Sequence, residues 1–214
     1  MDMSSLNPGK ALIFRITHLD NVPWMLDHGL HCRNSPTFDP QFRNIGSAGL
    51  IAKRHRREVP IPPRGTLSDY VPFYFTPYSI MLYNIKTGYG GVPHVPNEQI
   101  VILVSSLRKN HELGHSFVFT NQHAYPLAAE YFNDLDDLDR VDWPLLQARN
   151  FCHDPEDPGK KERYQAEALI YQSLPASSLL GIGCHSEAVK AGLQSEIAKR
   201  NLSMEIAVRP SWYF

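Results

Sequence analysis

The run Ile100–Val104 is the feature that most constrains the fold, because it places five consecutive aliphatic side chains between polar neighbours. A run of this length that is rich in β-branched residues predicts a buried strand. It is far shorter than the roughly 20 apolar residues that a membrane-spanning helix needs. The chain is therefore expected to be built around a sheet.

Other segments extend this sheet and place helices between its strands. Further strands are expected at Ala11–Ile16, Tyr70–Tyr83 with an interruption at Pro77, Phe117–Thr120, Leu179–Cys184 and Met204–Val208. Helices are expected from a cap at Asp20 or Asn21 to a stop at Gly29, and at Ala48–Glu58, Leu127–Phe132, Lys160–Gln165 and Glu187–Lys199. Periodicity leaves Ala168–Tyr171 open between helix and strand. With no linker in the chain, the pattern predicts one α+β domain over residues 1–214.

Two polar stretches are expected to connect these elements. Asn34–Gly46 is irregular and polar, which is typical of a loop. Asn133–Arg149 carries five aspartates but no glycine for the turn of a calcium loop. A solvated loop with helix caps is the favoured interpretation of that acidic stretch.

Charge and cysteine content limit the possible settings and partners. The chain has 21 Lys and Arg against 22 Asp and Glu, a net charge of −1, so a nucleic-acid partner would need a local basic patch. Three cysteines favour reduced thiols and a cytoplasmic protein over a disulfide framework. The first ten residues lack the apolar core of a signal peptide, and no membrane association is expected.

Four segments carry candidate chemistry. Thr17 and His18 end the first expected strand, where a histidine can fix a ribose or an amide. The run Lys53–Arg57 is basic, and guanidinium groups suit a pyrophosphate or a DNA backbone. The aromatic residues of 71–78 can form core or stack a nicotinamide or a base. Glu167 enters an apolar run, which is costly unless the carboxylate is paired or functional.

The letters His111-Glu112-Leu-Gly-His115 match the HExxH zinc-protease pattern. Gly114 lies inside the match, and the stretch is polar and lies between two expected strands. A short turn is therefore favoured over the long buried helix of a zinc protease, and no metal site is predicted. The chain also lacks a glycine-rich phosphate loop, a dinucleotide fingerprint and a serine-elbow motif.

Taken together, these segments resemble the DarT family of bacterial DNA ADP-ribosyltransferase toxins over nearly the whole chain. The resemblance is carried, in order, by Thr17–Asn21, the basic helix around Arg54, Asp69–Tyr74 with Met81–Tyr83, Gln165–Ile170 and Arg209–Tyr213. One such motif would be weak evidence, whereas five in the same order are specific.

The resemblance implies an ADP-ribosyltransferase fold, with a split central β-sheet around a cleft for NAD. It implies transfer of ADP-ribose from NAD to thymidine bases in single-stranded DNA, with sequence preference, which blocks replication. It also implies a macrodomain antitoxin like DarG that removes the modification. NAD is the expected co-substrate.

The resemblance also implies roles for particular residues. The catalytic pair falls on Glu167 and Arg54, with Arg57 as the fallback if the helix register differs. Thr17, His18, Leu19 and Arg54 are the expected NAD contacts, and His123 and Tyr74 the expected contacts of the target base. A flexible element over NAD is expected at about residues 34–53, and a loop that presents the target at about residues 123–167.

Three alternatives stay open from the sequence. One is a transferase of the same fold that acts on protein or RNA. The second is a zinc hydrolase that uses His111, Glu112 and His115. The third is a non-catalytic nucleic-acid-binding module built on the basic helix.

Overall fold

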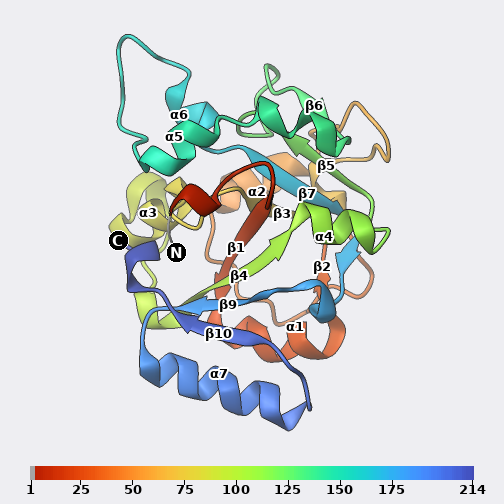
Figure 1. The fold of residues 1–214 in the computed structure, drawn as a ribbon, viewed down its shortest axis with the longest axis vertical. Coiled ribbons are helices and arrows are strands. Elements are labelled where there is room, and N and C mark those ends of the chain that lie inside the picture. Colours follow the sequence, from red (N-terminus) through yellow and green to blue (C-terminus); the bar gives the residue numbers. More distant parts are fainter. Residues whose placement is uncertain (1–2) are drawn as a thin grey trace.

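The computed structural model describes residues 3–214, which form one domain around a central sheet (Figure 1). The sheet has eight strands in the order β10-β9-β4-β1-β3-β7-β5-β6, and a separate ribbon pairs β2 with β8. The strands are β1 Leu12–His18, β2 Leu30–His31, β3 Tyr70–Tyr74, β4 Ile100–Ser106, β5 Phe117–Thr120, β6 Tyr131–Phe132, β7 Glu167–Tyr171, β8 Ser173–Leu174, β9 Gly181–Cys184 and β10 Glu205–Val208. The α-helices are α1 Val22–His28, α2 Ala48–Arg54, α3 Ile80–Thr87, α4 Leu107–Glu112, α5 Trp143–Ala148, α6 Lys160–Arg163 and α7 Glu187–Lys199.

The predicted buried strand lies near the middle of the sheet as β4. It pairs with β1 through seven residues, from Leu12 opposite Ser106 to His18 opposite Ile100. Residues 100–103 of β4 are at most 1% exposed, which agrees with an apolar run buried on both faces. All pairs in this sheet are antiparallel except β9 with β10, whose connection is α7.

The sheet is split between β1 and β3. Only Phe14 and Tyr74 are paired across this junction, against the seven pairs between β1 and β4. Beyond that pair the strands diverge, and the Arg15 guanidinium bridges the gap with a 2.9 Å hydrogen bond to the carbonyl of Pro72. The predicted α+β fold with a split central sheet is therefore confirmed.

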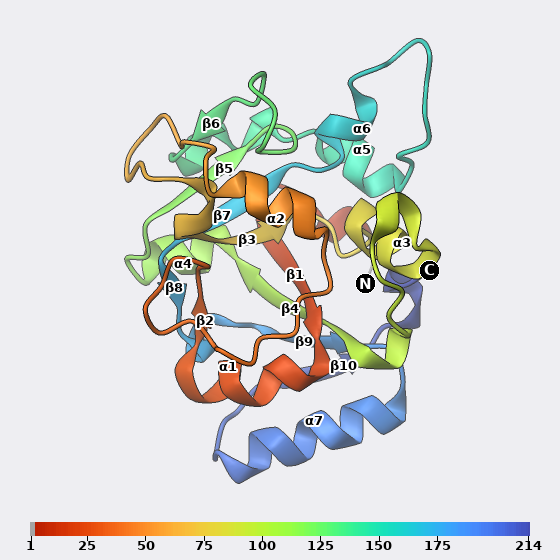
Figure 2. The same ribbon diagram turned by 180° about the vertical axis from the view of Figure 1, so that it is seen from behind.

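Helices and loops cover the two faces unequally. Figure 2 shows α2 in front of β3 and β7, close to the split. The long helix α7 packs on β9 and β10 at the other end of the sheet. The start of α2 follows from its sequence, because the Ser47 hydroxyl caps the helix by accepting a hydrogen bond from the backbone N–H of Leu50.

Several predicted elements are confirmed with small changes of boundary. Strand β5 and helix α7 have the predicted bounds, and the open segment Ala168–Tyr171 is part of the strand β7. In the acidic stretch, Asp134 caps a 3-10 helix at Leu135–Arg140 and Asp142 caps α5. Their carboxylates accept the backbone N–H groups that a helix start leaves unpaired, so the predicted capping role is confirmed.

Two predictions were wrong in type. Only the first half of Tyr70–Tyr83 is a strand, because Pro77 ends it and Ser79 then caps the helix α3. The helix predicted at Leu127–Phe132 is absent, since its end pairs with β5 as the edge strand β6. The Leu127 side chain is 88% exposed, so it contributes no buried apolar surface that would stabilise a helix there. The helix predicted at Ala48–Glu58 is also shorter, ending at Arg54.

The C-terminal motif has a packing role. A Cβ on Gly183 would lie 2.5 Å from the Trp212 ring, so only glycine lets this indole lie against β9. The Tyr213 hydroxyl then donates to the carbonyl of Ile100, 3.0 Å away in β4. Burial raises the pKa of Tyr213 above its ordinary value, which keeps the hydroxyl protonated as a donor.

Within residues 3–214, no helix is both long and apolar enough to span a bilayer. The cysteines Cys32, Cys152 and Cys184 are free thiols, of which only Cys152 is exposed.

Candidate active site

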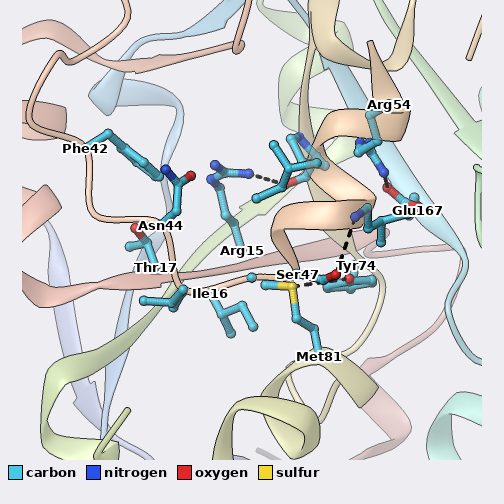
Figure 3. Close-up of a pocket in the computed structure, with 15 residues that line it drawn as sticks. Arg15, Ile16, Thr17, Phe42, Asn44, Ser47, Arg54, Tyr74, Met81 and Glu167 are labelled. Atoms are coloured by element: carbon cyan, nitrogen blue, oxygen red, sulfur yellow. Dashed lines mark hydrogen bonds and ion pairs between the residues drawn. The ribbon is translucent and has the colours of Figure 1, made fainter. Parts of the chain in front are cut away.

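A pocket of about 720 Å³ opens where the sheet is split (Figure 3). Its floor is formed by residues of β1, β3 and β7, and its roof by residues 42–51, which lead into and along α2. Met81 closes one side from α3.

Glu167 and Arg54 meet in this pocket. Arg54 Nη1 donates a 2.9 Å hydrogen bond to Glu167 Oε2, and the carboxylate side chain is 3% exposed. Arg54 is the last residue of α2 and Glu167 the first of β7, so residues 113 positions apart are brought together. A buried carboxylate is costly without a partner, and this ion pair supplies one.

The other oxygen of Glu167 is held by the loop between β5 and β6. Oε1 accepts a 3.0 Å hydrogen bond from the backbone N–H of Ala124, and His123 Nε2 lies 3.7 Å away. His123 is itself fixed by its backbone N–H, which donates to the carbonyl of Glu162. The carboxylate is thus oriented before any ligand binds.

The Arg54 guanidinium has unused hydrogen-bonding capacity. Its Nη2 is buried and has no partner among the described residues, and the same holds for the Nε of Arg15 on the pocket floor. Both N–H groups are therefore able to donate a hydrogen bond to an anionic or polar ligand in the pocket. Burial lowers the pKa of Arg15, and repulsion by the Arg54 guanidinium lowers it further, to about 10.

Tyr74 completes the pocket floor beside Glu167, its Cα partner across β3 and β7. Burial, and then the nearby Glu167 carboxylate, raise the pKa of Tyr74 well above its ordinary value. Its hydroxyl therefore stays protonated at neutral pH. The hydroxyl lies 3.9 Å from the sulfur of Met81, and a thioether sulfur is only a weak hydrogen-bond acceptor (Figure 3).

The structure brings some predicted NAD contacts to the pocket and leaves others beside it. Thr17 lines the pocket, with its hydroxyl accepting a 3.0 Å hydrogen bond from Asn21. The His18 ring is buried next to it, engaged with the Asp20 backbone N–H and the Gln99 side chain. Leu19 lies away from the pocket and lines a separate hollow together with residues of α7. The assignment of His18 and Leu19 to NAD stays a prediction.

The fallback arginine lies elsewhere. Arg57 follows the end of α2 and donates a 3.1 Å hydrogen bond to the carbonyl of Pro126. It does not line the pocket, whereas Arg54 does. The register with Arg54 at the carboxylate is therefore the one that the fold adopts.

Sequence reasoning missed Arg15 and several roof residues. Arg15 lies within the expected strand Ala11–Ile16, and a charged residue inside an apolar strand is the same signal that singled out Glu167. Asn44 and Phe42 carried no signal, because an irregular loop gives no direction to its side chains. The roof does fall inside the predicted element of residues 34–53.

The zinc-protease pattern is split by the fold. Helix α4 ends at Glu112, and Gly114 then adopts a φ of +76°, so His111 and His115 share no helix face. His115 instead contacts the Ser178 hydroxyl at 3.2 Å. Among residues 3–214, no group of three or more His, Cys, Asp or Glu side chains is placed to hold a metal ion.

A split sheet with an arginine-paired glutamate at the junction defines an ADP-ribosyltransferase-like fold. Residues 14–214 match the family described as "ssDNA thymidine ADP-ribosyltransferase, DarT", and the chain belongs to this family. The predicted family and class of enzyme are thus confirmed.

Similar proteins and solved structures match nearly the whole length of the chain. A DNA ADP-ribosyl transferase of Escherichia coli O127:H6 is 54% identical over 211 residues, covering 99% of this chain and 97% of that protein. The solved structure of Thermus sp. 2.9 DarT in complex with ADP-ribosylated ssDNA is 34% identical with a TM-score of 0.89, covering 97% of this chain and 98% of that one. The same Thermus protein in complex with NAD+ gives a TM-score of 0.82 at 35% identity, over 96% and 98% of the two chains.

Proposed function

We propose that this protein transfers ADP-ribose from NAD to a thymidine base in single-stranded DNA, with sequence preference, as the toxin of a toxin–antitoxin pair. The observation that carries the proposal is the Arg54–Glu167 pair, buried in a pocket with unpaired guanidinium N–H groups. The Thermus relatives, solved with NAD+ and with ADP-ribosylated ssDNA, support the same two substrates.

The geometry suits each step of the transfer. Glu167 would bind the hydroxyls of the nicotinamide ribose and stabilise the positive charge that develops as the bond to nicotinamide breaks. The bonding electrons leave with nicotinamide, and the acceptor atom of the base then attacks the ribose and releases its proton to solvent water. Arg54, with its unpaired Nη2, would bind the pyrophosphate and stabilise negative charge on the base. Its guanidinium is a poor base, which favours this electrostatic role.

The remaining residues have supporting roles in the proposal. Thr17, His18 and Leu19 at the end of β1 would contact NAD, under the flexible element of residues 34–53 that contains the pocket roof. Tyr74 and His123 flank Glu167 and would contact the target base. Single-stranded DNA supplies an unstacked base at low cost. Residues 123–167, a segment that contains β6, α5 and α6 and ends at Glu167, would present that base.

An oligonucleotide assay tests the proposal. The protein is incubated with NAD and single-stranded oligonucleotides in which all four bases are permuted, and the products are weighed by mass spectrometry. The expected result is an added ADP-ribose on thymidine-containing strands only. Adducts on protein or RNA without any on DNA would instead establish the alternative, a transferase of the same fold with another acceptor.

The cellular context is part of the same proposal. We infer that residues 1–214 act as one domain, since β1 and β10 belong to one sheet and Leu6, ahead of β1, is buried. We infer a cytoplasmic location from the three cysteines, which are free thiols. A separate macrodomain antitoxin like DarG would remove the modification and permit growth. Expression of the chain with and without such a partner is expected to give growth only with it, and Glu167→Gln alone should relieve the toxicity.

A further inference from the structure

The motif Thr17–Asn21 contains two residues without a role in the transfer. Its first three residues are the proposed NAD contacts, whereas Asp20 and Asn21 follow them towards α1. Asn21 is 1% exposed and directly precedes that helix. An asparagine at this position commonly accepts a hydrogen bond from the first turn of the helix. The Asn21 side chain makes no such bond, so its amide is directed to other partners.

The Asn21 amide pairs with the backbone of Arg43. Its Oδ1 accepts a 2.8 Å hydrogen bond from the Arg43 N–H, and its Nδ2 donates to the Arg43 carbonyl at 3.0 Å. Nδ2 also donates to the Thr17 hydroxyl, at 3.0 Å. Both N–H donors and the oxygen of the amide are thus engaged, which fixes its orientation. One buried side chain therefore ties the end of β1 to a backbone segment 22 residues further along the chain.

Arg43 directly precedes the part of the roof that crosses the pocket. Residues 44–46 line the pocket, and Ser47 then caps α2. Within the part of the chain that the structure describes, no hydrogen bond between backbone groups involves residues 43–46. Backbone N–H and C=O groups are normally paired in a helix or with a neighbouring strand. Asn21 takes the place of such a neighbour for this segment.

Two further contacts hold the same segment less specifically. The Arg43 guanidinium pairs with the Asp20 carboxylate, and both side chains are 58% exposed. Exposed ion pairs contribute little because water and salt screen them. Ile45 is buried in the hydrophobic core, but apolar burial has no direction. The buried amide of Asn21 is therefore the contact that sets where the roof lies.

The same amide contacts both the floor and the roof of the pocket. Thr17 lines the pocket at the end of β1, and Figure 3 shows Asn44 of the roof next to it. A ligand that lies between floor and roof needs both surfaces in place. If the roof were in place only part of the time, the apparent affinity for the ligand would fall by the same fraction. The Asn21 contact is therefore linked to the binding of whatever lies under the roof.

We propose that Asn21 is a positioning residue for NAD, which holds roof residues 44–46 beside Thr17 before NAD binds. Asn21 is not among the residues that line the pocket, so it acts through the roof and not on the reacting atoms. It therefore sets the affinity for NAD and leaves the chemical step to the Arg54–Glu167 pair. The inference rests on the proposed function, because it takes NAD as the ligand under the roof.

The first experiment measures NAD binding by calorimetric titration in a Glu167→Gln background, which prevents turnover. Asn21→Ala should raise the Kd for NAD about tenfold, because the ligand must then order the roof itself. The matched control is Asn110→Ala. Asn110 is also fully buried, and its Nδ2 donates to the Ser105 hydroxyl and the Ser106 carbonyl, away from the pocket. This control should lower the Tm in the same way but keep the Kd for NAD of the parent protein.

Two further readouts separate positioning from folding. In the otherwise wild-type enzyme, Asn21→Ala should raise the KM for NAD while kcat at saturating NAD stays near the wild-type value. If Asn21→Ala does not fold, Asn21→Asp has the same shape and keeps an acceptor for the Arg43 N–H. It lacks both N–H donors, so the Kd for NAD should again rise.

A second experiment follows the roof contact itself by hydrogen exchange of the Arg43 amide, measured by NMR without NAD or DNA. Exchange should be faster in Asn21→Ala and unchanged in Asn110→Ala, since only the first variant removes the acceptor of that N–H. An unchanged Kd for NAD in Asn21→Ala, an equal rise in both variants, or unchanged exchange of the Arg43 amide would overturn the inference. If the wild type forms no DNA adduct but Asn21→Ala alone weakens NAD binding, the proposed function fails while the role of Asn21 stands.

Discussion

The Arg54–Glu167 pair and the roof of the pocket are held in different ways. The pair consists of opposite charges that are largely buried, and the carboxylate is fixed further by the Ala124 backbone N–H. Among the described residues, roof residues 44–46 make no backbone–backbone hydrogen bond, and the uncharged amide of Asn21 holds the backbone just before them. Buried charges are little screened and stay oriented, which suits bond breaking. A segment with few hydrogen bonds opens at low cost, which suits the entry and release of a ligand.

The largest effect is expected from the carboxylate of the pocket. Glu167→Gln keeps an oxygen to accept the Ala124 N–H but removes the negative charge, so the loop should stay in place while the transition state loses its partner. We expect kcat for ADP-ribose transfer to fall about 10³-fold, as for loss of one preorganised electrostatic contact. Transfer kinetics measure the loss of kcat, and circular dichroism checks that the variant is folded. An active Glu167→Gln enzyme would contradict the proposed role.

The next effect separates the charge of Arg54 from its shape. Arg54→Lys keeps the positive charge but loses the planar fork that reaches Glu167 with Nη1 and leaves Nη2 for a ligand. We expect kcat/KM for NAD to fall about 10²-fold. Arg57→Lys is the matched control and should stay near the wild-type value. If the two variants lost activity equally, the register of α2 would not decide catalysis.

A smaller effect is expected from the second arginine of the pocket floor. Because burial and the repulsion by Arg54 lower the pKa of Arg15 to about 10, Arg15 is charged below that pH and neutral above it. Its charge faces the pocket, so KM for NAD should rise as the pH increases from 9 through about 10. The Tyr74 hydroxyl keeps its proton in this range, since its pKa is raised. In Arg15→Met, KM should be higher at pH 8 and should lose this pH dependence; the same rise in the variant would assign it to another group.

The smallest effect tests the roof side of the comparison. The ion pair of Asp20 with Arg43 is exposed, so it is weak and screened by salt. Asp20→Asn should therefore raise the Kd for NAD only about twofold at low salt, and the difference should vanish at about 0.5 M salt. Lys190→Met on α7 serves as the matched control and should leave the Kd as in the wild type. A rise as large as that expected for Asn21→Ala would mean that the surface ion pair, and not the buried amide, holds the roof.

The local sequence determined much of the fold. The aliphatic run at Ile100–Val104 predicted the buried strand β4, and α7 has its predicted ends because Ser186 caps it and its apolar side chains recur on one face. These features depend on interactions within a few residues. The predictions failed at Leu127–Phe132, where pairing of Tyr131 and Phe132 with β5 overrides any local helix preference.

The candidate site followed a similar division. Motifs pointed to Glu167 and Arg54, since a carboxylate in an apolar run and a basic helix are visible in the chain. Their contact depends on α2 and β7, which are separated by more than a hundred residues, and only the sheet order brings them together. The same applies to the unpaired guanidinium groups of Arg15 and Arg54, because hydrogen-bond satisfaction is a property of the packed interior.

The sequence by itself therefore pointed to Glu167 and Arg54 as candidate catalytic residues, and it placed those strands and helices whose signals are local, such as β4 and α7. The tertiary structure alone decided that β1 and β3 diverge after one residue pair, that Arg54 and not Arg57 faces the carboxylate, and that the Asn21 amide pairs with the backbone of the roof. The physical reason is range: capping, periodicity and chain stiffness act between neighbours along the chain. Burial, ion pairing and the shape of a hollow arise only when distant segments pack.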